Sequence, residues 1–364
     1  MSGIFSARWI RIYLVPGAVF QSVMIGGGYG TGREIVEYFT RFGFLGGALG
    51  LGIAYLLMAG VLALTFELSR VTRTYDYRNF FKQLLGRGWV AYEVLVILGF
   101  LLILAVLASA AGNILRDNLR IPYFAGIAVM LACIGVLTFY GRELIAKVLT
   151  FWSLFLYVVF LTFFVVIFAQ AGDTIQQQIA HGEIIPGWAK SGLKYGAYNI
   201  SMLPLLLFVA RGFESRREAT VSGLIAAAIA LIPGAIFHVA FLAAYPAILE
   251  QSIPVYWMLG QFGFTALVVI YSIMLFGTFI ETGAGLLQGI NDRLDAYRTE
   301  ITGQGFSRLV HAGVAVAAVS GSALLSLVGI TALIAHGYGA VSWAFLLVYI
   351  LPLATVGLRR IVRQ

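Results

Sequence analysis

The sequence has 364 residues, of which 60% are hydrophobic and only 11% are charged. A water-soluble protein of this length could not cover its surface with so few charged side chains, so the composition excludes that class. The formal charge is +8 at pH 7. The basic residues lie in short loops between apolar segments, which is typical of membrane orientation and argues against nucleic acid as a partner. Cys133 is the single cysteine, so the chain has no disulfide framework.

The apolar residues form stretches of about 20 residues, the length that crosses a lipid bilayer. They predict an all-α integral membrane protein with ten transmembrane helices, at about residues 10–40, 44–69, 89–115, 121–140, 143–170, 192–212, 218–246, 264–290, 306–328 and 338–358. Residues 77–86 are expected to form a short interfacial helix. The external segment 251–259 is too short to span, and is either an amphipathic lid or an ordered surface loop.

The longest segment without a span, residues 171–190, is interpreted as an external connector. It separates a first five-helix repeat, residues 1–170, from a second one, residues 191–364. Because each half has an odd number of spans, the second half enters the membrane from the opposite face. If the halves are structural repeats they are inverted repeats, an arrangement common in secondary transporters.

With a cytoplasmic N-terminus, 18 of the 24 Lys and Arg residues fall on or near the inner side and five fall outside. Arg33 lies within the first span. Short cytoplasmic loops carry an excess of Lys and Arg, so this asymmetry predicts that both termini are cytoplasmic. The expected location is the cell inner (plasma) membrane.

The first span is interrupted near its middle, where residues 26–34 read GGGYGTGRE. Glycine costs about 1 kcal/mol relative to alanine in a helix, so this segment favours unwinding. Unwound carbonyls can coordinate a cation, and the N–H groups that begin the next half-helix favour an anion. The alternative is that the glycines only let two helices pack closely. Arg33 favours a polar interior, with Glu34 and Glu37 as its partners or as outer gate residues.

The sixth span carries Asn199, Ser201 and Pro204 near its middle. Proline removes a backbone donor, and the Asn199 and Ser201 side chains can satisfy the freed backbone groups. A simple proline kink is the alternative. Interrupted spans at corresponding positions of two halves are the strongest sequence indication of a transporter binding site.

Residues 25–39, IGGGYGTGREIVEYF, resemble the first-helix signature of the YkvI-like bacterial membrane proteins. These proteins are similar to the amino acid–polyamine–organocation superfamily, and the resemblance implies the fold of the leucine transporter LeuT. It also implies that backbone groups of the first break bind a solute carboxylate, with the sixth span opposite and the third span, around Leu104 and Ser109, lining the same cavity. The candidate solute-binding residues are Gly28, Tyr29, Gly30, Thr31, Arg33, Ser109, Asn199 and Ser201.

Glu281 in the eighth span is a carboxylate at membrane depth, which is either structural or functional. By the same resemblance, a sodium site would combine first-span carbonyls with eighth-span side chains. The candidate coupling-ion residues are Met24, Gly27, Thr278, Glu281 and Thr282. All of them except Thr278 are candidate direct ligands of sodium. A proton carried by Glu281 is the alternative to sodium. No other cofactor is expected.

The function predicted from these features is secondary active transport of a small organic solute, an amino acid or a related zwitterion or anion. A passive channel and a membrane receptor or sensor on the same fold are the alternatives. Enzyme chemistry is not expected, because the sequence has neither a metal-ligand cluster nor a phosphate-binding loop. The sequence does not specify the oligomeric state.

The orientation is testable with reporters fused after Gln364. A green fluorescent protein should fluoresce there and an alkaline phosphatase should be inactive, because the predicted C-terminus is cytoplasmic. An active phosphatase with a dark fluorescent protein would contradict the orientation and, with it, the inverted arrangement of the halves.

Overall fold

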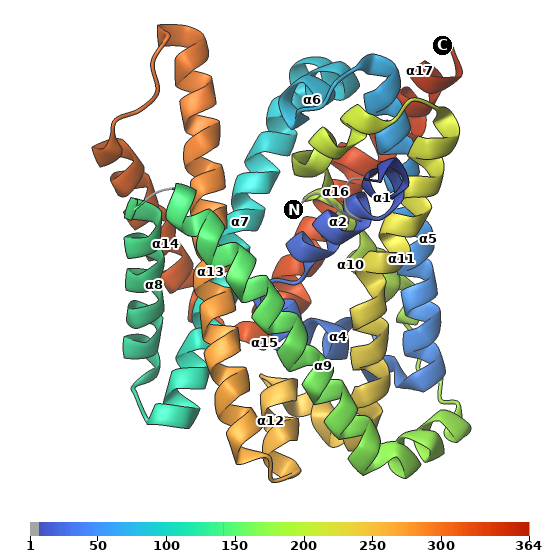
Figure 1. The fold of residues 1–364 in the computed structure, drawn as a ribbon, viewed down its shortest axis with the longest axis vertical. Helices are drawn as coiled ribbons and strands as arrows, with labels where there is room; N and C mark the ends of the chain where they lie inside the picture. Colours follow the sequence, from blue (N-terminus) through green and yellow to red (C-terminus); the bar gives the residue numbers. More distant parts are fainter. Residues whose placement is uncertain (1–6, 141, 364) are drawn as a thin grey trace.

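The computed structural model describes residues 7–140 and 142–363, and within these ranges it consists of helices and turns without a β-strand (Figure 1). Seven of the described helices are long and apolar enough to cross a membrane, and residues Tyr123–Val136 form a shorter apolar helix. The first and sixth spans are additional and broken. The predicted all-α membrane class is therefore confirmed.

The first half begins with a broken span and continues with four long helices. The broken span consists of α1 (Arg8–Tyr13), α2 (Val15–Met24), α3 (Gly27–Gly30) and α4 (Arg33–Tyr38). After a short turn, η2 (Thr40–Phe42), the long helices are α5 (Gly43–Thr72), α7 (Trp89–Leu119), α8 (Tyr123–Tyr140) and α9 (Arg142–His181).

Helix α9 runs beyond the predicted end of the fifth span. It bends at Ala171 and then continues to His181, through residues that the sequence analysis took for the connector. This part is polar, which concealed it from a search for apolar spans, but glutamine and alanine are good helix formers. Ile175 is buried against the rest of the protein.

The second half has the same order of a broken span followed by longer helices. The broken span is α10 (Trp188–Ile200) and the 3₁₀-helix η4 (Leu203–Gly212), followed by α11 (Arg216–Phe241), α13 (Thr265–Thr302) and α14 (Arg308–Ser326). The last span joins α15 (Ile330–Ala332), η7 (Leu333–Tyr338), α16 (Gly339–Phe345), η8 (Leu346–Ile350), η9 (Leu353–Gly357) and α17 (Leu358–Val362). Elements η7, η8 and η9 are π-helical.

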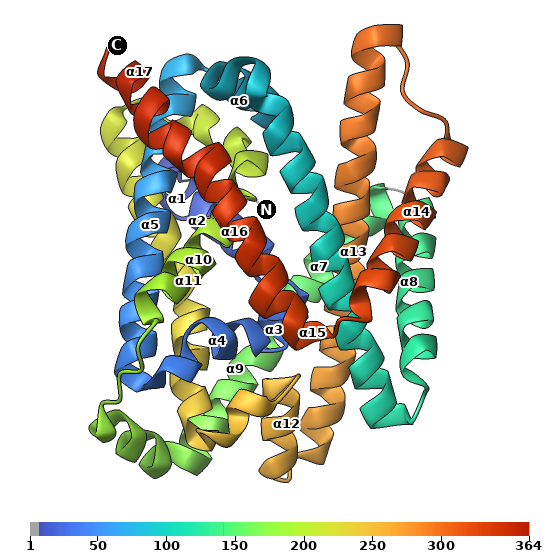
Figure 2. The same ribbon diagram turned by 180° about the vertical axis from the view of Figure 1, so that it is seen from behind.

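Two groups of helices pack around the first break. In one group α5 packs against α10 and α11, and α11 packs against α2. In the other, α7 packs against α8, α13 and α14 (Figures 1 and 2). The short helix α3 contacts both α7 and α13, so the break lies where the two groups meet.

Glycines allow the helices of the first group to touch through their backbones. A Cβ atom added to Gly192 in α10 would lie 2.2 Å from the carbonyl oxygen of Gly50 in α5. One added to Gly223 in α11 would lie 2.5 Å from the backbone nitrogen of Ala63. Small residues at a membrane helix interface permit this close approach.

The two short segments outside the spans lie at opposite ends of the molecule (Figure 1). The predicted interfacial helix is α6 (Tyr77–Leu85), whose N-cap Asp76 accepts a hydrogen bond from the backbone of Asn79. Its apolar face packs on protein, and Phe81 stacks on Tyr92 with 3.6 Å between the ring centroids. At the other end, the predicted segment 251–259 contributes to α12 (Pro254–Gln261).

Candidate functional site

The first span unwinds at two places on either side of α3. Helix α2 ends at Met24, and the carbonyl of Met24 accepts a hydrogen bond from the Gly26 N–H at 2.8 Å. After α3 the chain turns at Gly32, whose φ of 81° lies in the left-handed region that glycine adopts without strain. The Thr31 hydroxyl donates to the Gly28 carbonyl at 2.7 Å and so satisfies one exposed oxygen. The predicted break in the first span is confirmed.

The sixth span is broken after Ile200. The N–H groups of Ser201 and Met202 donate to the carbonyls of Tyr198 and Asn199, at 3.1 and 3.3 Å, which tightens the chain into a turn. Element η4 then begins with a proline in its first turn. The Tyr92 hydroxyl in α7 donates to the Ser201 carbonyl at 2.9 Å. This span is therefore interrupted and not merely kinked.

A small central cavity of about 50 Å³ lies between the two breaks. Four of the residues predicted from the sequence line it: Met24, Gly28, Asn199 and Thr282. The remaining lining residues come from six elements and the two breaks: Val23, Gly26, Glu34, Ile103, Tyr198, Met202, Leu286 and Tyr338. The Asn199 side-chain amide donates one hydrogen bond to the Tyr195 carbonyl at 3.0 Å, which leaves its second N–H and its side-chain oxygen to contact a ligand.

Four of the predicted solute-binding residues surround the break without lining the central cavity. The Tyr29 ring packs edge-on against Phe237 in α11. The Gly30 carbonyl accepts a hydrogen bond from the Tyr271 hydroxyl at 2.6 Å. Thr31 is bonded to Gly28, as described above, and the buried Ser201 hydroxyl has no hydrogen-bond partner among the described residues.

A larger inner cavity of about 620 Å³ opens towards the end of the molecule where α6 lies. The predicted α13 residues Thr278, Glu281 and Thr282 line it. The Thr278 hydroxyl donates its proton to the Met274 carbonyl at 2.8 Å, which leaves oxygen lone pairs free to accept or coordinate. Four residues line both this cavity and the central one: Val23, Met202, Thr282 and Leu286. The central cavity therefore adjoins the inner one.

An outer cavity of about 940 Å³ lies on the opposite side of the breaks. Its basic lining residues are Arg33, Arg41, Arg116, Lys194 and His336, and its acidic one is Glu37. Ser109 also lies here, where its hydroxyl accepts a hydrogen bond from Tyr123 at 2.9 Å. Among the described residues, none lines both the outer and the central cavity.

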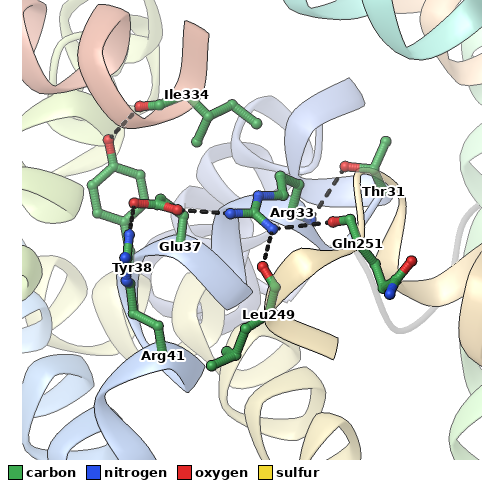
Figure 3. A network of polar contacts seen from close by, with 8 residues as sticks. All are labelled: Thr31, Arg33, Glu37, Tyr38, Arg41, Leu249, Gln251 and Ile334. Carbon is green, nitrogen blue, oxygen red and sulfur yellow. Dashed lines mark hydrogen bonds and ion pairs between the residues drawn. The ribbon is translucent and has the colours of Figure 1, made fainter. Parts of the chain in front are cut away.

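A polar network separates these two cavities, and Arg33 is at its centre (Figure 3). The Arg33 guanidinium donates to the carbonyls of Leu249 and Gln251 at 2.7 and 3.0 Å, and it forms an ion pair with Glu37 at 2.8 Å. Glu37 also pairs with Arg41. Arg33, predicted to bind solute, thus points outward from the break and ties it to the segment before α12.

Two further contacts close the same side of the molecule. The Tyr38 hydroxyl donates to the Ile334 carbonyl of η7 at 3.1 Å (Figure 3), and the Val255 N–H of α12 donates to the Thr31 carbonyl at 3.3 Å. The segment around α12 therefore lies directly on the break.

The sequence analysis did not identify Glu34, Tyr198 or Tyr338 as site residues, although all three line the central cavity. It grouped Glu34 with Glu37 as partners of Arg33. Residues four apart share a helix face and neighbouring residues do not, so Glu37 was the better partner from spacing alone. In the described part of the chain, no cluster of three or more His, Cys, Asp or Glu residues could hold a metal ion.

No protein-family model matches the sequence. The chain is 25% identical over 292 residues to the uncharacterized membrane protein YkvI of Bacillus subtilis (strain 168), covering 77% of this chain and 80% of that protein. This similarity agrees with the resemblance in residues 25–39.

Several solved structures share the fold at low sequence identity. A Na⁺-coupled sialic acid symporter in a substrate-bound outward-open state aligns with a TM-score of 0.63, 14% identity, and 94% and 78% coverage of the two chains. Mhp1 in an inward-facing conformation aligns with a TM-score of 0.57, 16% identity, and 92% and 76% coverage. MhsT in complex with L-phenylalanine aligns with a TM-score of 0.57, 14% identity, and 98% and 97% coverage of the two chains. The chain is therefore similar in sequence to YkvI and has the LeuT-type fold.

Proposed function

We propose that the protein is a secondary active transporter that moves a small organic solute by alternating access. One observation carries this proposal: the cavity between the two helix breaks adjoins the inner cavity and is separated from the outer one by the Arg33 network. Discontinuous helices that place a site at membrane depth are the usual construction of such transporters. The structure would then represent an inward-facing state with its outer gate closed.

The charge distribution supports a cytoplasmic position for the end of the molecule that carries α6 and α17. Most basic residues outside the spans fall on that side, and both termini would be cytoplasmic in the plasma membrane. Residues 1–170 and 191–364 would be the two inverted halves, each beginning with its broken span. The partners are then the lipid bilayer and the solute.

The break in the first span and the inner half of α13 would together bind the coupling ion. Thr282 lines both the central and the inner cavity, and its methyl group lies 3.7 Å from the position of a Cβ added to Gly26. The carboxylate of Glu281, the hydroxyl of Thr282 and the carbonyls of Met24 and Gly27 supply the oxygen ligands that a hard cation such as sodium prefers. A sodium-coupled symporter with the same fold supports sodium over a proton.

The transport function is tested by uptake into proteoliposomes. Purified protein should accumulate one of a panel of radiolabelled amino acids in a saturable manner, and only when a sodium or proton gradient is imposed. A passive channel would equilibrate the solute without accumulation or saturation. A receptor would bind the ligand without any uptake.

Substitution of Gly28 should impair this uptake. A Cβ added to Gly28 would lie 2.2 Å from a carboxylate oxygen of Glu34 inside the central cavity. Overpacking of this kind costs about 1–3 kcal/mol, or roughly five- to 150-fold in solute affinity for Gly28→Ala. The larger Gly28→Leu and Gly30→Leu should abolish uptake.

Gly60→Ala in α5 is the matched control, because a Cβ added there would meet no heavy atom within 4 Å. It should retain affinity close to that of the wild type, and thermal unfolding should verify that all variants are folded. Normal binding and uptake by Gly28→Leu and Gly30→Leu would indicate that these glycines serve packing alone.

Removal of the Arg33 side chain should open the outer gate. Breaking a buried ion pair costs about 3–5 kcal/mol, so Arg33→Leu should destabilise the closed state. In a Cys133→Ser background carrying Asn199→Cys, a membrane-impermeant thiol reagent added outside should react at least about tenfold faster. Arg116→Leu is the control, since Arg116 lines the same outer cavity but pairs, among the described residues, only with the neighbouring Asp117. Equal rates in both variants would argue against a gate at Arg33.

Glu281→Gln tests the coupling-ion assignment, because glutamine keeps the size of the side chain and removes its charge. Solute binding should be retained while its dependence on sodium is lost, measured as the change in solute affinity between sodium and potassium buffers. Unchanged ion-driven uptake in this variant would exclude Glu281 as a ligand or carrier of the coupling ion.

A further inference from the structure

A carboxylate without a partner faces the central cavity. Glu34 is 3% exposed, and no described residue forms a hydrogen bond or an ion pair with it; its Oε2 atom is fully buried and unsatisfied. Its other oxygen, Oε1, lies against Gly28 at the first break. A Cβ atom added to Gly28 would be 2.2 Å from this oxygen. Placing an ionised carboxylate in such a site is costly unless a cation pairs with it.

The adjacent arginine does not supply this cation. The two terminal nitrogens of Arg33 are taken by Glu37 and by the carbonyls of Leu249 and Gln251, on the outer side of the break. Glu37 in turn has both Arg33 and Arg41. Two carboxylates three residues apart are therefore in opposite situations: Glu37 has two arginine partners, and Glu34 has none among the described residues.

Two stacked tyrosines line the cavity beside Glu34. Tyr198 comes from the end of α10 and Tyr338 from the π-helical turn η7, and their rings stack with 4.1 Å between centroids and 15° between planes. The faces of aromatic rings attract cations, most strongly when the cation is desolvated.

The rest of the lining distinguishes between kinds of cation. Sodium requires a shell of oxygen ligands, whereas only two of the other side chains around this cavity, Asn199 and Thr282, are polar. The remaining ones are apolar: Val23, Met24, Ile103, Met202 and Leu286. An organic ammonium group is more weakly hydrated than sodium, and it needs only a carboxylate for its N–H groups and ring faces for its charge. The combination of one carboxylate, two aromatic rings and apolar walls fits this ligand.

We propose that Glu34 and the Tyr198–Tyr338 pair bind the ammonium group of the transported solute. This inference rests on the proposed transport function and specifies its substrate class: amines and zwitterions, and not simple anions. The central cavity of about 50 Å³ accommodates the ammonium head alone. The remainder of the solute extends past Thr282 and Leu286 into the inner cavity.

The first experiment compares ligands that differ only in their charged groups. Thermal unfolding of the purified protein is measured with leucine, with isopentylamine, which lacks the carboxylate, and with isocaproate, which lacks the ammonium group. Alanine, ethylamine and propionate form a second set, and phenylalanine, phenethylamine and hydrocinnamate a third. In at least one set the zwitterion or the amine should raise the unfolding temperature, and the acid should not. If no ammonium compound stabilises the protein, or if the acids stabilise it equally, the proposal is wrong.

The second experiment repeats the measurement on variants, using the ammonium compound that stabilises the wild type most. Glu34→Gln should bind it about 10- to 150-fold more weakly, since hydrogen bonds to charged groups are the strong ones. Tyr198→Leu should weaken binding about two- to 30-fold, and Tyr198→Phe, which keeps the ring, should bind normally. Asp173→Asn removes an exposed carboxylate on α9 and should leave affinity unchanged. A Glu34→Gln variant that unfolds at the wild-type temperature without ligand verifies that its fold is intact.

Two other roles for Glu34 give different results. If it carries a proton, Glu34→Gln keeps its affinity for the ammonium compound and loses only proton-driven uptake. If it binds sodium, sodium chloride alone stabilises the wild type and not the variant, while ammonium binding persists in potassium buffer. Either result overturns the proposal. Gradient-driven uptake of an anion without an amine would also overturn it and leave the transport function intact, whereas binding without any uptake would refute the transport function alone.

Discussion

The need to satisfy backbone polar groups at membrane depth governs the architecture around the two breaks. An unwound helix within lipid would expose N–H and C=O groups at a cost of several kcal/mol each. Here the exposed oxygens are taken by side chains from neighbouring helices: Tyr271 of α13 bonds to the Gly30 carbonyl, and Tyr92 of α7 bonds to the Ser201 carbonyl. The breaks therefore exist only where α7 and α13 surround them, and the same enclosure forms the central cavity.

The glycines of the first span serve both purposes that the sequence suggested. Gly32 supplies a left-handed turn, and an added Cβ would lie 2.4 Å from the Phe241 ring of α11, so it is also a packing residue. Gly28 leaves room for the Glu34 carboxylate. Helix packing and helix unwinding were posed as alternatives, but a short helix such as α3 requires both, because its turns must be tight and its neighbours must come close.

The charged side chains of α4 point to two different sides of the helix. Arg33 and Glu37, four residues apart, point to the outer network, while Glu34 points to the central cavity. In the proposed transporter, this half-helix has one side on the outer gate and the other on the solute site, and so links the two directly. In the proposed transport cycle, a movement of α4 that releases Leu249 and Gln251 from Arg33 would also shift the Glu34 carboxylate, and would so couple occupation of the site to closure of the gate.

The sequence by itself determined the membrane class, the spans, the short helix at residues 77–86 and the break at residues 26–34, because hydropathy, amphipathic spacing and glycine content are local properties of the chain. Only the tertiary structure decided which polar residues meet. It placed Ser109 at the outer cavity and Glu34 in the central one, and it stacked Tyr198 on Tyr338, two residues 140 positions apart in the chain. It also extended α9 to His181 through polar residues. These outcomes depend on how each helix is rotated about its axis and on which neighbour it packs against, and neither is encoded in any single segment.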